Sequence, residues 1–216
     1  MLNWLGFGRS LGEGFSPETP LRTQRYVVLD TELTSLDNRT NRILSIGAVV
    51  MQGSRILLGE DFYREINPGV PVPGGTVLVH GLRPADVVHA EPPFQVLMDL
   101  KTFTEGAVIV GHFVSLDVKA LQKELGGHGH DLNNPAVDTA RVHRWILRNG
   151  HPTDDAGHRH DDLSLETLAA EYALPVHHMH HALGDAFLTA QLWQKLMFKL
   201  EPLGIRTLGQ LMRIAG

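Results

Sequence analysis

Short apolar runs, separated by amphipathic stretches, set the pattern of this chain. Five of the runs are rich in strand-forming residues and predict strands at 26–30, 42–51, 60–66, 107–110 and 136–137. Gly53 and Ser54 indicate a hairpin between the second and third strands. Close connections early in the chain and helical crossovers later predict an α/β fold. The expected sheet is mixed and five-stranded, antiparallel over its first three strands and then parallel, with helices on its faces.

Helical periodicity and helix-end signals describe most of the remaining chain. They predict helices at 84–87, 93–103, 115–125, 138–145, 164–172, 182–200 and 204–215. Asp138 and Ser164 are suitable N-caps, and Gly150 ends the helix that Asp138 begins. We accordingly expect an N-terminal arm at 1–24, one domain at 25–200, and a short C-terminal helix or tail at 201–216.

The composition narrows the class of protein. The 216 residues include no cysteine, which excludes disulfides, thiolate zinc sites and cysteine nucleophiles and allows a reducing compartment, so we expect a cytoplasmic protein. No apolar run approaches the length of a membrane span, and the glycine-rich start lacks the features of a signal peptide. A net charge of −5 argues against binding nucleic acid through a broad basic surface. It does not argue against an enzyme that acts on a strand end through bound cations.

Four carboxylates stand out because they end or interrupt apolar segments. Asp30 and Glu32 follow the first predicted strand, and they point to one face because side chains alternate along a strand. Like charges so close repel, and one would take up a proton unless cations intervened. Asp185 lies on the apolar stripe of its helix, where a carboxylate needs a metal, a basic partner or water. Asp117 lies near the start of its helix, where the helix dipole favours an anion.

These acids predict a hydrolytic metal centre. Hard divalent ions such as Mg²⁺ and Mn²⁺ prefer oxygen ligands. Two such ions balance the charge of four carboxylates, and at a separation of roughly 4 Å they hold the attacking and leaving oxygens of an in-line displacement. His180 precedes Asp185 by five residues, which is poor phasing for one helix face. We therefore expect His180 in the loop before the helix, free to act as a general base, since imidazole changes charge close to neutral pH.

Three motifs contain these residues. They are DTELTSL at 30–36, VGHFVSLD at 110–117 and HHALGDA at 180–186, and a shorter VHGL stands at 79–82. In these motifs the chain resembles the DEDDh branch of the exonuclease superfamily, over about residues 25–198. One motif alone is weak, but three in order at spacings that suit one domain are specific.

The resemblance implies a ribonuclease-H-like fold and 3′-to-5′ removal of nucleoside 5′-monophosphates from single-stranded DNA or RNA. It implies two Mg²⁺ or Mn²⁺ ions held by Asp30, Glu32, Asp117 and Asp185, with His180 as general base. The residues expected near the substrate are Thr31, Leu33, Thr34, Leu36, His80, His112 and Phe113. The partner would be the 3′ end of a nucleic acid. A proofreading or repair role would need a separate polymerase or repair protein.

The chain departs from the family pattern beside Asp117. Phe113 stands where Asn is usual, and Leu116 stands where Phe is usual. Leu33 and Ser35 replace the commoner Thr and Gly of the first motif. These changes alter the expected contacts with a nucleotide and leave the four acids intact.

Two other interpretations stay open. An exonuclease-fold module that binds nucleic acid or regulates without turnover would share the motifs. Two groups of histidines also suggest a transition-metal protein, although solvated loops are favoured because regular ligand spacing is missing. The groups are His151, His158 and His160, and His177, His178, His180 and His181.

Overall fold

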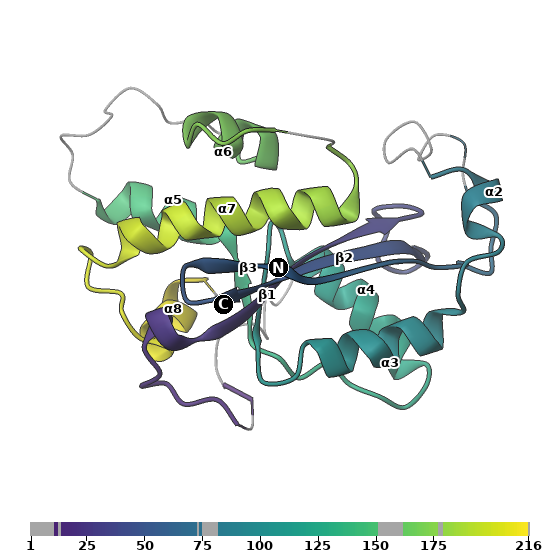
Figure 1. Ribbon diagram of the computed structural model, residues 1–216, viewed down its shortest axis with the longest axis horizontal. Helices are drawn as coiled ribbons and strands as arrows, with labels where there is room; N and C mark the ends of the chain where they lie inside the picture. Colours follow the sequence, from purple (N-terminus) through teal and green to yellow (C-terminus); the bar gives the residue numbers. More distant parts are fainter. Residues whose placement is uncertain are drawn as a thin grey trace, which may run out of the picture.

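A five-stranded sheet forms the centre of the computed structural model, which describes residues 11–12, 14–72, 74, 82–150, 162–176 and 179–215 (Figure 1). The strands lie in the order β3-β2-β1-β4-β5, so β1 has a partner on each side. β2 pairs antiparallel with β1 and β3, whereas β4 pairs parallel with β1 and β5. The predicted mixed sheet is confirmed. The strands are β1 (Arg25–Leu33), β2 (Ile43–Gln52), β3 (Arg55–Glu65), β4 (Val108–Gly111) and β5 (Ala136–Asp138).

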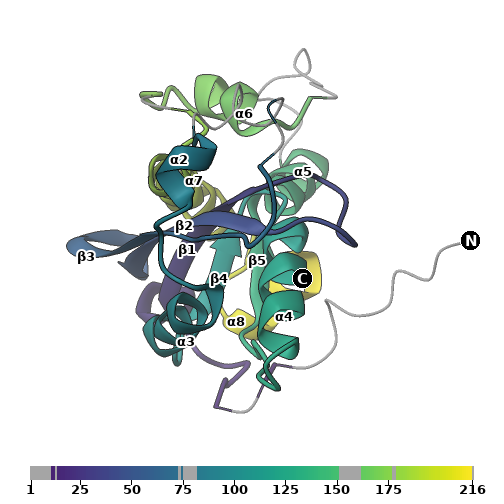
Figure 2. The ribbon, with the colours of Figure 1, turned by 90° about the vertical axis from the view of Figure 1, so that its right-hand side faces the viewer.

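Helices cover both faces of this sheet, with α3 and α4 on one face and α5 and α7 on the other (Figures 1 and 2). Strand alternation produces two cores. Val27 and Leu29 of β1 pack in the core with α3 and α4, whereas Tyr26 and Val28 pack in the core with α5 and α7. Trp193 of α7 meets the Tyr26 ring edge-on, with centroids 5.6 Å apart. The helices are η1 (Leu21–Thr23), α2 (Pro84–Val87), α3 (Pro93–Phe103), α4 (Ser115–Gly126), α5 (Thr139–Asn149), α6 (Leu165–Glu171), α7 (Ala182–Leu200) and α8 (Leu208–Ala215).

Both predicted N-caps are confirmed. Asp138 Oδ1 accepts hydrogen bonds from the main-chain N–H groups of Ala140 and Arg141, at 2.9 and 3.3 Å. The Ser164 hydroxyl accepts one from the N–H of Thr167 at 3.3 Å. These side chains satisfy N–H groups that the first turn of a helix leaves unpaired, which fixes where α5 and α6 begin.

The largest difference from the predicted elements is at β3, which begins at Arg55 rather than at residue 60. Ile56 pairs with Met51, but the next paired residue of β3 is Asp61, opposite Val49. The intervening residues form an irregularity that interrupts the ladder. The sequence pattern predicted only the regular part that follows it.

The two ends of the described chain are bonded to each other. Leu21 N–H donates to Arg206 O, and Leu208 N–H donates to Thr19 O, both at 2.9 Å. Leu21 and Leu208 are also buried in one core. The boundaries predicted near residues 24 and 200 therefore fall between segments that pack against each other. The division into arm, domain and tail stays a prediction. No helix within the described residues is long and apolar enough to cross a membrane.

Candidate active site

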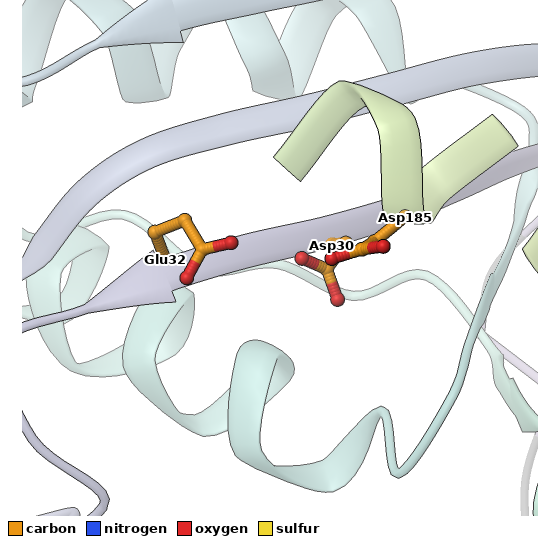
Figure 3. A group of neighbouring side chains, drawn as sticks. All are labelled: Asp30, Glu32 and Asp185. Carbon is orange, nitrogen blue, oxygen red and sulfur yellow. The ribbon is translucent and has the colours of Figure 1, made fainter. Parts of the chain in front are cut away.

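Three carboxylates from two elements converge near the carboxyl end of β1. Asp30 and Glu32 lie on β1 and Asp185 lies in the first turn of α7 (Figure 3). One carboxylate oxygen from each lies within 4.8 Å of the others. Asp185 is buried, and the two strand acids are half-buried. Across the described residues, this is the one group of three or more His, Asp or Glu side chains close enough to hold an ion.

Gly47 allows α7 to approach these acids. It pairs with Asp30 across β1 and β2. A Cβ atom on Gly47 would overlap the main chain of Ala182 and Leu183, the first two residues of α7. The missing side chain therefore lets the helix rest directly on β2 and brings Asp185 to Asp30. Glycine inside an apolar strand is a sign of such a close approach, and Gly47 is not among the site residues predicted from the sequence.

Asp117 reaches the same region from α4. Its Oδ1 accepts two hydrogen bonds from Thr31, one from the main-chain N–H at 3.0 Å and one from the hydroxyl at 2.6 Å. Thr31 stands between Asp30 and Glu32 on β1, so these bonds tie α4 to the strand at the site. The oxygens of Asp117 are not part of the group within 4.8 Å, but its charge acts on both strand acids.

Burial disfavours the charged forms of all four acids, and neighbouring carboxylates add to this effect at Asp30 and Glu32. Burial, and then the charges of Asp117, Glu32 and Asp185, raises the pKa of Asp30 well above its usual range. Burial and the charges of Asp185 and Asp117 raise the pKa of Glu32 to about 7. Burial raises the pKa of Asp117 to about 7 and also raises that of Asp185. No lysine or arginine in the described part of the chain forms an ion pair with any of them.

The donor set fits hard divalent cations. Asp185 Oδ1 is buried and has no hydrogen-bond partner within the described residues, a costly arrangement that a bond to a cation would relieve. Ligands that are all oxygen favour Mg²⁺ or Mn²⁺, whereas zinc is bound mostly by nitrogen and sulfur. Asp30, Glu32 and Asp185 are the residues placed to hold such an ion.

His180 lies in the loop directly before α7. The poor helical phasing between His180 and Asp185 predicts this position. Its main-chain N–H donates to Asp185 Oδ2 at 2.9 Å, and its side chain is exposed. The charge of His180 is close enough to lower the pKa of Asp185, against the larger effect of burial. His180 has a φ of 63°, a left-handed conformation that turns the chain into the helix.

His181, one of the clustered histidines for which a solvated loop is predicted, has structural contacts. Its Nδ1 accepts a hydrogen bond from Gly184 N–H at 3.4 Å and caps α7. Its ring stacks on Tyr63 of β3, with centroids 4.7 Å apart. The two contacts hold the start of α7 to the sheet beside the acids.

Two residues expected to contact substrate are exposed. Leu36 follows β1 and is 81% exposed, and Phe113 follows β4 and is 49% exposed. Both are apolar side chains at the ends of strands that border the acids. His80 lies outside the described residues.

Three other expected substrate residues turn their side chains into the protein. The Thr31 hydroxyl donates to Asp117, and Thr34 Oγ1 accepts from the N–H of Arg42 at 2.9 Å. Leu33 packs in the core with α3 and α4. Any contact of these three residues with a substrate would have to come from the main chain.

His112 uses both ring nitrogens inside the protein. Nδ1 lies 2.8 Å from Thr139 Oγ1, and Nε2 lies 2.7 Å from the carbonyl oxygen of Leu163. A carbonyl only accepts, so Nε2 carries the proton of the neutral ring. Burial lowers the pKa of His112 and favours this neutral form. His112 thus joins the end of β4 to α5 and to the segment before α6.

Comparison with protein families matches residues 27–193 to the family described as Exonuclease, RNase_T. The chain belongs to this exonuclease family. The matched residues include all but the first two residues of β1, the rest of the sheet, and the part of α7 that carries Asp185. The predicted family is therefore confirmed.

Curated relatives of this exonuclease chain include bacterial replication proteins. It is 33% identical over 201 residues to a DNA polymerase III subunit epsilon-like protein of Rhodobacter capsulatus, covering 92% of this chain and 27% of that protein. It is 29% identical over 189 residues to a PolC-type DNA polymerase III of Caldanaerobacter subterraneus, covering 86% and 12%. It is 26% identical over 176 residues to the DNA polymerase III subunit epsilon of Aquifex aeolicus, covering 81% of each. The chain thus spans a small part of the first two relatives.

Solved structures share the fold of this exonuclease chain. E. coli Exonuclease I in complex with a dT13 oligonucleotide matches with a TM-score of 0.73 and 16% identity, covering 83% of this chain and 42% of that one. A zinc-bound complex of E. coli ExoI with single-stranded DNA matches with a TM-score of 0.74 and 15% identity, covering 84% and 42%. The predicted ribonuclease-H-like exonuclease fold is confirmed.

Proposed function

We propose that this protein is a metal-dependent 3′–5′ exonuclease that hydrolyses the terminal phosphodiester bond of single-stranded DNA or RNA and releases nucleoside 5′-monophosphates. The observation that carries the proposal is the convergence of Asp30, Glu32 and Asp185 within 4.8 Å. Membership of the exonuclease family supports the reaction. The oligonucleotides in the E. coli Exonuclease I complexes support the substrate class.

Asp30, Glu32, Asp117 and Asp185 would hold two Mg²⁺ or Mn²⁺ ions. Four ionised carboxylates carry four negative charges, which two divalent ions balance. When bound, such a pair of ions supplies stabilisation of the charge that develops on the attacking and leaving oxygens. The chain itself fixes the ligands, since Thr31 holds Asp117 against β1 by two hydrogen bonds.

His180 would be the general base that accepts a proton from the attacking water. Its side chain is exposed, so water and a strand end can reach it. Its main-chain bond to Asp185 keeps the loop beside the acids. Once protonated, the imidazolium would be stabilised by the negative charge of Asp185, and an arrangement fixed in advance lowers the cost of that charge transfer.

A separate polymerase or repair protein would deliver the strand end. The curated relatives are named as DNA polymerase III proteins, and one of them is an epsilon subunit that this chain matches over 81% of its length. The names of these bacterial relatives also support a cytoplasmic location.

The test uses single-stranded DNA and RNA oligonucleotides of one sequence, labelled at the 5′ end. With Mg²⁺ or Mn²⁺ the wild-type protein should shorten them from the 3′ end and release nucleoside 5′-monophosphates, and a chelator should abolish the reaction. Asp30→Asn should lower the rate by roughly 10²–10³-fold or more, because a ligand next to the reacting oxygens is lost. Asp61→Asn is the matched control, since Asp61 is an exposed acid of β3 outside the cluster.

If the wild type and Asp30→Asn released equal amounts of product with every metal tested, the proposal would be rejected. Tight oligonucleotide binding without cleavage would instead favour a nucleic-acid-binding or regulatory module. Stoichiometric zinc in the purified, untagged protein, with no nuclease activity, would favour a histidine-based metal protein.

A further inference from the structure

One side of α5 carries only cationic side chains among its charged residues. Arg141, Arg144 and Arg148 are spaced three and four residues apart, so they share one side of the helix. Arg144 and Arg148 are exposed, and Arg141 is half-buried. The helix sequence Thr139–Asn149 contains no aspartate or glutamate. This arginine face stands out in a chain whose net charge is −5.

Arg144 and Arg148 repel each other. Like charges four residues apart destabilise a helix, and neither arginine forms an ion pair with an acid in the part of the chain that the structure describes. The helix dipole favours a cation in the last turn, which accounts for Arg148 but not for Arg144. A row of anions along the arginine face would offset this repulsion.

The arginine face begins close to the acidic site. Asp138, the N-cap of α5, pairs with Gly111 of β4, and β4 pairs with β1. Neighbouring strands lie about 4.8 Å apart, so the start of α5 is about 10 Å from β1. α5 also packs against α7, the helix that carries Asp185 (Figure 2). At a rise of 1.5 Å per residue, Arg144 and Arg148 lie about 8 and about 14 Å beyond the start of α5.

We propose that Arg144 and Arg148 bind phosphates of the substrate strand several nucleotides upstream of the bond that is cleaved. The inference rests on the proposed function and adds a second part of the substrate that the protein recognises. Guanidinium groups match phosphates in geometry and charge. Phosphate contacts carry no sequence information, so the arginine face would hold a strand of any sequence. Its local positive charge would also attract a polyanion to a chain of negative net charge.

The kinetic test varies the length of the strand. The substrates are a dinucleotide, too short to extend from the acids to Arg144, and a twelve-residue homopolymer of the same base and sugar. In the double variant Arg144→Gln, Arg148→Gln, we expect kcat/KM for the long strand to fall by about tenfold through a higher KM, with kcat unchanged. The value for the dinucleotide should stay within about twofold of the wild type, because that substrate does not reach α5.

The binding test varies the salt concentration. Affinity for the long strand is measured by fluorescence anisotropy with a chelator present, so that no cleavage occurs. Each phosphate contact contributes about 0.7 to the slope of log affinity against log salt for a single strand, so the glutamine double variant should reduce that slope by about 1.4. Its thermal midpoint should be unchanged or higher, because the repulsion between the two arginines is removed.

Two other double variants serve as controls. Arg144→Lys, Arg148→Lys keeps both charges and should retain most of the salt dependence. Arg22→Gln, Arg55→Gln removes the same charge from exposed arginines of η1 and β3, at the other end of β1 from the acids. This second control should change neither the salt slope nor the preference for the long strand.

An unchanged salt slope in the glutamine double variant would overturn the inference and would favour an acidic protein as the ligand of the arginine face. Equal losses on the dinucleotide and the long strand, or equal losses in the Arg22 and Arg55 control, would also overturn it. A protein that shows the reduced slope but cleaves neither substrate would contradict the proposed function and still support the arginine face. Cleavage with an unchanged slope would have the opposite meaning.

Discussion

The main-chain N–H of His180 donates a hydrogen bond to Oδ2 of Asp185 at 2.9 Å. The proposed base and a proposed metal ligand are therefore joined through the start of α7. The bond uses the backbone of His180 and leaves the imidazole free. The ring can thus be removed without breaking the link.

His180→Gly removes the imidazole and keeps the main-chain bond to Asp185, because glycine adopts a positive φ without strain and retains the N–H. We expect kcat to fall by about 10²–10⁴-fold and the acidic limb of the pH–rate profile to disappear, as for the loss of a general base. Binding of Mn²⁺, measured by calorimetry, should stay within a few-fold of the wild type. His181→Ala is the control and should keep the acidic limb. An unchanged profile in His180→Gly would exclude the base role.

Gly47→Ala tests the close approach of α7 to β2. The new methyl group would overlap the main chain of Ala182 and Leu183, so the helix start must shift and carry Asp185 away from Asp30. We expect a loss of roughly 1–3 kcal/mol of stability in denaturant unfolding and weaker divalent-ion binding. Gly126→Ala, at a position where an added Cβ atom would meet nothing within 4 Å, should cause neither change. Wild-type stability and metal affinity in Gly47→Ala would contradict the contact.

The stability of the metal-free protein should fall as the pH rises through about 7. Burial and neighbouring charges raise the pKa of Glu32 from 4.5 to about 7, and burial raises that of Asp117 from 3.8 to about 7. The folded state therefore binds protons that the unfolded state has already released, and this stabilisation is lost as the acids ionise. With a chelator present, we expect the thermal midpoint to drop by a few degrees between pH 6.5 and 8.5.

The chosen pH window avoids an opposing group. Burial lowers the pKa of His143 from 6.5 to about 4. The contribution of His143 to the stability of the fold therefore increases with pH up to about 6.5 and stays constant above that value. Adding Mn²⁺ at pH 8.5 should restore the midpoint, and the double variant Asp30→Asn, Glu32→Gln should flatten the dependence. A midpoint that rises with pH in the chelator would show that the acids are not strained by their charges.

Thr31→Val tests the bond that orients Asp117. The substitution removes the hydroxyl bond at 2.6 Å and keeps the main-chain bond at 3.0 Å. Loss of such an orienting partner typically weakens metal binding by about 10- to 100-fold. Titration calorimetry with Mn²⁺ measures the effect, and Thr31→Ser should restore it. If Thr31→Val bound Mn²⁺ as tightly as the wild type, the main-chain bond alone would be enough to position Asp117.

The part of the site predicted from sequence is the part encoded by local pattern. Strand alternation placed Asp30 and Glu32 on one face, and both prove to belong to the acidic cluster. Helical phasing placed Asp185 inward with Leu188 and Leu192, and all three are buried. These inferences need only the period of one element and its apolar face.

The part that sequence could not predict depends on contacts between distant segments. The Thr31 hydroxyl bonds to Asp117 across 86 residues of chain, and nothing in either motif shows which oxygen meets which donor. The close approach of α7 to Gly47 likewise depends on how a helix lies on a strand more than a hundred residues earlier. Propensity and periodicity describe single elements, so they do not report the distance between two of them.

The site has a rigid part on the central strand β1 and a part at the start of α7 that can unfold locally. Asp30 and Glu32 lie on a strand that pairs with β4 as far as Val28 and with β2 at both acids, so the two acids can move away only if β1 separates from β2. His180 and Asp185 lie where α7 begins, and a helix end frays at a lower free energy than a central strand. Amide hydrogen exchange should therefore be slowest in β1 and faster at 180–185. Local unfolding at the start of α7 would remove Asp185 and His180 from the site together, while Asp30 and Glu32 stay in place.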